Sequence, residues 1–267
     1  MKEKIKPIDL SEYQCPSEKD YLIAYVDILG TKERLNQTNE SEIFKNIYHP
    51  FLFAGKVAPI FEHYKLDGIS IKVFSDNILF ACPIEHRNDK DEVLASYTKL
   101  GWLLKDFLSL LAKNGILFRG AITLDKLYIN ELMVWGKGLL TVVDLEENVA
   151  VYPRILLSDS LLKVFKEFGL EGVEFEEKFS CLQDADDGVF FDFIDYNDFD
   201  TEKLLKALLL QIFQKIDEEK SGRMRPKILQ KYFWWKNYLK TAESTFYDIN
   251  SDFLERINVR PDATKDV

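Results

Sequence analysis

Two acidic residues interrupt apolar stretches that otherwise have the composition of buried strands. Residues 21–30, YLIAYVDILG, contain Asp27, and residues 68–84, GISIKVFSDNILFACPI, contain Asp76. The second stretch predicts a β-hairpin with Ser-Asp-Asn at its tip. An ionised carboxylate is costly in apolar surroundings unless something pairs with it, so each Asp needs a partner.

The two carboxylates together predict a cation site, provided that their strands are neighbours. Two close carboxylates repel each other, and a shared proton or bound cations relieve the repulsion. Neither Asp27 nor Asp76 has a His or Cys beside it, which favours hard divalent cations with oxygen ligands. The alternative is that Asp27 caps a strand-to-helix turn and Asp76 only forms the hairpin turn.

Composition excludes several classes of protein. A chain of 267 residues with 46% hydrophobic residues can bury a large core and is not expected to be disordered. A net charge of -10 argues against a broad face that binds nucleic acid. No apolar run approaches the roughly 20 residues that span a bilayer, so no membrane partner is expected. The three scattered cysteines and the charged N-terminus favour a cytoplasmic protein.

The order of expected elements predicts an α+β fold. Residues 1–20 are expected to be a loose leader, followed by a core over 21–158. The core elements are a strand at 21–29, a proline-kinked helix at 40–64, the hairpin, a helix at 93–112, a strand at 116–124 with a partner at 127–135, a helix at 137–149 and a strand at 152–157. This is a ferredoxin-like βαββαβ unit, an antiparallel sheet covered by helices on one face. In it the first strand and the hairpin are central neighbours.

Residues 159–267 are expected to form an extension that packs on the core. It would contain a helix at 160–168, a β-hairpin at 173–194, a helix at 204–216 and an aromatic helix around 230–240. Aromatic residues interleaved with lysines can also stack on bases, but at helical spacing they favour a packing face. The acidic turn with Asp184, Asp186 and Asp187 lacks most of a calcium loop, so a solvated turn is expected.

Four segments together resemble the catalytic domain of the class III nucleotidyl cyclases. They are AYVDILG at 24–30, KVFSDNILFA at 72–81, FRGAIT at 118–123 and VWGKGLLTVVDLEENVAVYPRI at 134–155. Within that superfamily the chain is most similar to the pyrimidine cyclases, uridylate and cytidylate, of the Pycsar antiphage defence systems. The resemblance covers about half of the chain, residues 21–157.

The resemblance implies a metal site and part of a nucleotide site. Asp27 and Asp76, with the Ile28 carbonyl, would hold two divalent cations, Mn²⁺ or Mg²⁺. Tyr25 and Lys72 would lie near the ribose and base. The backbone N–H groups around Leu29 and Gly30 would bind phosphates; Arg119 would be catalytic and Arg154 would bind substrate.

The chain also departs from the family. Purine cyclases carry an Asn and an Arg on the helix after the Trp-Gly turn, where this sequence has Leu140 and Asp144. Arg119 or Arg154 would then supply the missing positive charge; the alternative for each is a structural ion pair with a carboxylate. The family further implies a head-to-tail homodimer with its sites at the interface.

The implied activity is conversion of UTP, or CTP, to the 3′,5′-cyclic monophosphate and pyrophosphate by a two-metal mechanism, making a second messenger in antiviral defence. One alternative is a catalytically silent module that binds nucleotide or a partner, as the loss of the Asn and Arg suggests. A palm-like nucleotidyltransferase is a third reading, which the acidic surface disfavours. Spacing alone does not select among uracil, cytosine, adenine and guanine.

Overall fold

One mixed sheet organises the chain in a computed structural model that describes residues 17–31, 68–170, 179–198, 200–222 and 225–258. The expected helix at 40–64 and most of the leader lie outside these residues. The strand order is β2-β3-β1-β4-β6-β8-β7, with β5 paired to β4. The strands are β1 (Lys19–Ile28), β2 (Ser70–Phe74), β3 (Asn77–Ile84), β4 (Phe118–Ile129), β5 (Val134–Trp135), β6 (Ile155–Leu157), β7 (Cys181–Gln183) and β8 (Val189–Phe191).

Strand β1 lies between β3 and β4 and is antiparallel to both. The prediction that the first strand and the hairpin are central neighbours is therefore confirmed. The sheet is not purely antiparallel, however, because β6 runs parallel to β4. A parallel pair needs a crossover, and the helical segment between these two strands provides it.

Helices cover both faces of the sheet, whereas the sequence predicted helices on one face only. Helix α3 (Lys90–Lys113) begins at Asp89, whose carboxylate caps two backbone N–H groups. Its Phe107 contacts Phe80, which stands opposite Ala24 of β1. Helix α4 (Lys137–Asp144) instead packs on Ile23, the residue of β1 just before Ala24, because a Cβ at Gly138 would lie 2.3 Å from the Ile23 side chain. Successive residues of a strand face opposite sides, so α3 and α4 lie on opposite faces.

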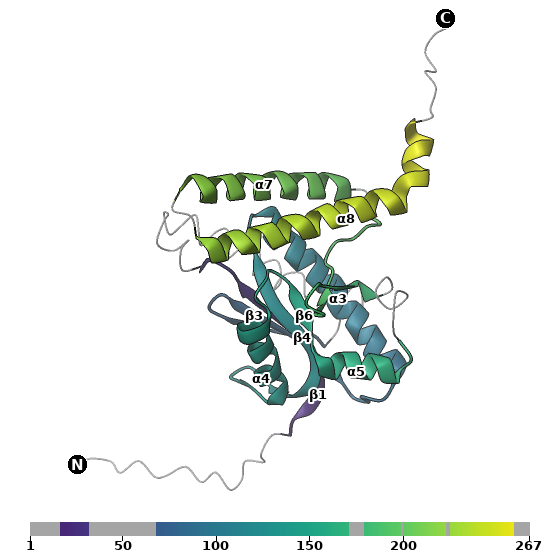
Figure 1. The fold of residues 1–267 in the computed structure, drawn as a ribbon. Coiled ribbons are helices and arrows are strands. Elements are labelled where there is room, and N and C mark those ends of the chain that lie inside the picture. The colour runs from purple at the N-terminus through teal and green to yellow at the C-terminus, as the bar shows by residue number, and fades with distance from the viewer. Residues whose placement is uncertain (1–16, 32–67, 171–178, 199, 223–224, 259–267) are drawn as a thin grey trace, which may run out of the picture.

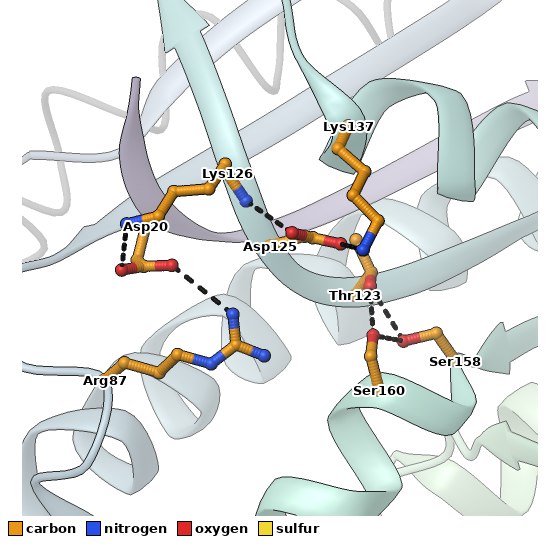
Figure 2. Close-up of polar contacts among 8 residues, drawn as sticks. All are labelled: Asp20, Arg87, Thr123, Asp125, Lys126, Lys137, Ser158 and Ser160. Atoms are coloured by element: carbon orange, nitrogen blue, oxygen red, sulfur yellow. Dashed lines mark hydrogen bonds and ion pairs between the residues drawn. The ribbon is translucent and has the colours of Figure 1, made fainter. Parts of the chain in front are cut away.

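Polar contacts fix the starts of α4 and α5 (Asp159–Glu167) on strand β4 (Figure 2). Lys137, the first residue of α4, lies 3.6 Å from Asp125. The hydroxyls of Thr123, Ser158 and Ser160 contact one another at 2.8 to 3.0 Å. Helix α4 thus begins near the C-terminal half of β4 and runs back along it, ending in a π-helical turn, η1 (Leu145–Val149).

Helices α7 (Thr201–Ser221) and α8 (Pro226–Asn258) run side by side across one end of the sheet (Figure 1). The aromatic helix expected at 230–240 lies within α8, and its Trp235 ring packs on Phe118 and Phe193. The Tyr238 hydroxyl donates to the buried carboxylate of Asp192 at 2.5 Å. The packing role predicted for this helix is confirmed, and α8 supports the first residue of β4. Among the described residues no helix is long and apolar enough to cross a membrane.

Candidate functional site

Three polar side chains form a row across the central strands. Asp27 of β1 stands directly opposite Asn77 of β3 and directly opposite Arg119 of β4. Residues opposite each other in antiparallel strands share a face. The Arg119 Nε donates to Asp27 Oδ2 at 3.2 Å. The row lies on the face that α4 covers, because Asp27 is four residues after Ile23.

Glu146 brings a further carboxylate to this row. It lies in η1, is 4% exposed, and its Oε1 is 2.5 Å from Arg119 Nη2. Sequence reasoning missed Glu146 because the segment 137–149 has the pattern of one continuous helix. The π-helical turn that sets where Glu146 points leaves no distinct signal in the sequence.

Asp76 lies at the hairpin turn next to the end of β1. The turn is tight, with a positive φ of 59° at Ser75, and the Asp76 carbonyl accepts a hydrogen bond from the Ile28 N–H at 3.1 Å. The Asp76 charge is close enough to contribute to raising the Asp27 pKa. The structure therefore brings the two predicted carboxylates to one place.

The predicted substrate residues Tyr25 and Lys72 belong to the same face. Tyr25 is two residues before Asp27, and both Tyr25 and Lys72 stand opposite Leu79 of β3. Burial raises the pKa of Tyr25 to about 12, and the charges of Glu146 and Asp27 add to this. The Lys72 Nζ donates to the Glu131 carbonyl at 3.1 Å, so the β4–β5 turn lies beside the hairpin.

The site has an excess of negative charge. Burial raises the pKa of Glu146 to about 7, and the Arg119 guanidinium opposes that shift. Burial also raises the pKa of Asp27, again against the effect of Arg119. Two carboxylates thus contact one guanidinium, with the Asp76 charge near enough to act on Asp27, an arrangement that attracts a cation.

The residues present fit hard cations. The Asn77 Oδ1 atom is buried and accepts no hydrogen bond within the described part of the chain. The Ile28 carbonyl accepts from Thr31 Oγ1 at 3.1 Å. Across the described ranges, no three His, Cys, Asp or Glu side chains form a ready-made metal cluster. Mg²⁺ is commonly held by one or two carboxylates and completes its shell with water and substrate phosphates, which the Asp27 and Asp76 pair allows.

The turn after β1 offers less than the sequence suggested. The Leu29 N–H already donates to the Leu117 carbonyl at 2.9 Å. Gly30 has a φ of +82°, a left-handed conformation that a side chain would strain. Of the two positions expected to bind phosphate through the backbone, Leu29 therefore has its amide engaged in the fold.

Arg154 does not join the cluster. Its guanidinium pairs with Asp184 and Asp186 in the β7–β8 turn, and its side chain is 1% exposed. Asp184 also accepts from the Trp234 indole at 2.6 Å, which ties α8 to this turn. The sequence predicted a solvated turn here. The turn is instead a binding partner within the fold, because two of its carboxylates neutralise a buried guanidinium.

The positions that replace the expected Asn and Arg are on the surface of α4. Leu140 is 71% exposed, and the exposed Asp144 accepts a hydrogen bond from Asn148 at 2.8 Å. Neither provides positive charge. Arg119 is accordingly the guanidinium that the structure places at Asp27.

No family model matches the chain, and no curated protein matches it. Among solved structures, the adenylyl cyclase CyaB from P. aeruginosa has a TM-score of 0.43 and 14% identity over 65% of this chain and 92% of its own. A bacterial light-regulated adenylyl cyclase has a TM-score of 0.41 and 12% identity, covering 72% of this chain and 100% of its own. A second such structure has a TM-score of 0.43 and 10% identity, covering 74% and 58%.

Proposed function

We propose that this protein is a metal-dependent nucleotidyl cyclase that converts a pyrimidine nucleoside triphosphate, UTP or CTP, to the 3′,5′-cyclic monophosphate and pyrophosphate. The observation that carries the proposal is that Asp27, at the end of β1, lies beside the hairpin turn that contains Asp76. Carboxylates outnumber guanidinium groups at this place. The choice of a pyrimidine base rests on the resemblance of the sequence to the Pycsar cyclases.

The proposed reaction is an intramolecular displacement. The ribose 3′-oxygen bonds to the α-phosphorus, the bond from that phosphorus to the α–β bridging oxygen breaks, and pyrophosphate leaves with the bonding electrons. The 3′-hydroxyl proton passes to water. When bound, two divalent cations lower the pKa of the attacking hydroxyl and neutralise the leaving group.

The residues of the chain have distinct roles in this scheme. Asp27, Asp76 and the Ile28 carbonyl hold the cations. Arg119 stabilises the negative charge that develops on the α-phosphate oxygens. Tyr25 and Lys72, which share a face two strands apart, would lie near the ribose and base.

A head-to-tail homodimer with sites at the interface is part of the proposal. Exposed apolar side chains flank the site on the hairpin, the β4–β5 turn and α4: Val73, Phe74, Leu132, Met133, Trp135 and Leu140. Lys72 links two of these elements through its bond to Glu131. Exposed large apolar side chains that gather on neighbouring elements commonly mark an interaction surface. Light scattering that gave a monomer mass at all concentrations would contradict this part.

The proposed product would act in the cytoplasm as a second messenger in antiviral defence, an assignment that again rests on the Pycsar resemblance. A silent nucleotide-binding module is the second candidate. It is favoured by Leu140 and Asp144, which supply no positive charge, and by Arg119, which two carboxylates already engage.

The test is to incubate purified protein with each ribonucleoside triphosphate separately, with Mn²⁺ or Mg²⁺, and to identify products by chromatography. We expect one pyrimidine triphosphate to give a cyclic monophosphate and an equal amount of pyrophosphate. Nucleotide binding with no product from any of the four would favour the silent module. A cyclic purine product would retain the cyclase and overturn the pyrimidine assignment.

A further inference from the structure

Arg119 is shared by two carboxylates through different nitrogens. Its Nε contacts Asp27 and its Nη2 contacts Glu146, at 3.2 and 2.5 Å. The guanidinium can therefore release one carboxylate without losing the other. Asp27 is on β1, Arg119 on β4 and Glu146 on η1, so three separate elements meet at this bridge.

A cation at Asp27 and the Arg119 guanidinium compete for the same carboxylate. The Asp27 Oδ2 atom that accepts from Arg119 is half of the carboxylate assigned to metal binding. A bound cation also repels the nearby guanidinium. An arginine that is largely buried needs a carboxylate partner, and the side chain of Arg119 is 22% exposed.

We propose that Glu146 is a positioning residue that holds Arg119 when a cation takes Asp27, and that it thereby sets the affinity of the site for the metal. This inference rests on the proposed function, because it uses Asp27 as a metal ligand. Glu146 is suited to the task because it is buried and lies in η1, where the Ala150 N–H closes the turn on the Leu145 carbonyl at 2.7 Å.

Without Glu146, Arg119 would keep Asp27 as its single contacting carboxylate and compete more strongly with the metal. The substitution Glu146→Gln is therefore expected to weaken Mn²⁺ binding about tenfold, a coupling of the size found for contacting charged residues. A merely structural Glu146 would alter thermal stability without changing the dissociation constant for Mn²⁺.

The experiment measures binding of Mn²⁺ alone to the full chain by the electron paramagnetic resonance signal of the free ion. Glu147→Gln is the matched control, because it makes the same chemical change at the exposed neighbouring position. Its effect is expected to stay within about twofold, as for a solvent-screened charge. The Arg119→Met background removes the competitor; because Glu146 also interacts directly with Asp27, adding Glu146→Gln there is expected to weaken Mn²⁺ binding clearly less than the same substitution does in the wild-type background.

Equal Mn²⁺ affinities for Glu146→Gln and Glu147→Gln would overturn the inference, as would a tenfold loss that persists in the Arg119→Met background.

If circular dichroism shows that Glu146→Gln does not fold, Glu146→Asp replaces it. Aspartate keeps the charge with a shorter reach, so intermediate weakening supports the inference and wild-type affinity overturns it. If wild-type protein binds no Mn²⁺ and forms no product, the proposed function itself fails. If the wild-type protein forms product and Glu146→Gln binds Mn²⁺ as tightly as wild type, the inference about Glu146 fails and the proposed function stands.

Discussion

Asp27→Asn is expected to lower product formation by at least about a thousandfold, the loss that follows when several kcal/mol of metal-derived stabilisation is removed. Asparagine keeps the shape of the side chain but removes the charge that holds a cation. The fold should persist, because Arg119 retains its contact with Glu146. Initial rates of cyclic nucleotide formation at saturating Mn²⁺ measure the effect, with circular dichroism as the check on folding.

The matched control is Asp20→Asn, the same chemical change on the same strand. Asp20 pairs with Lys126 and Arg87 at the other end of β1, away from the candidate site (Figure 2). Its loss is expected to change the rate by no more than about twofold, as for other ion pairs near the surface. Substantial activity in Asp27→Asn would refute the metal assignment. Equal loss in both variants would point to damage to the strand.

Gly120→Ala is expected to lower the free energy of unfolding by more than about 4 kcal/mol, or to prevent folding altogether. A Cβ at position 120 would lie 1.9 Å from the Tyr25 carbonyl oxygen, which belongs to the backbone of β1 and cannot rotate away. Strand β4 would have to separate from β1 where Arg119 meets Asp27. Urea unfolding followed by circular dichroism measures the change.

Gly101→Ala provides the comparison for this substitution. Gly101 lies inside α3, and a Cβ there would meet the Phe191 ring at 3.5 Å, an ordinary contact. Alanine should therefore stabilise the protein by about 0.5 to 1 kcal/mol, because glycine is the poorer helix former. A Gly120→Ala protein as stable as wild type would show that β1 and β4 are not packed as closely as described.

The parts of the fold that the sequence predicted are those with strong local patterns. The hairpin tip at Ser75 and Asp76 follows from two apolar runs around a polar turn. Helix α3 follows from one apolar stripe that ends at Asn114. Because these elements also fix the neighbours of β1, the approach of Asp27 to Asp76 was predictable without knowledge of tertiary contacts.

The contacts that sequence reasoning missed join residues far apart in the chain. The π-helical turn that carries Glu146 to Arg119 depends on how α4 packs against β4. The partners of Arg154 lie about 30 positions later, in a turn whose composition is that of a solvated loop. Neither periodicity nor spacing encodes such pairings, because each carboxylate has the same sequence pattern whether it faces water or a guanidinium.

Diffraction from crystals grown with Mn²⁺ and a pyrimidine triphosphate analogue, measured at the manganese absorption edge, tests the central claim most directly. We expect anomalous peaks within about 2.1 to 2.2 Å of carboxylate oxygens of both Asp27 and Asp76, near the distance of small hard cations. Nucleotide density without a manganese peak at these residues, or a peak held by other side chains, would contradict the account.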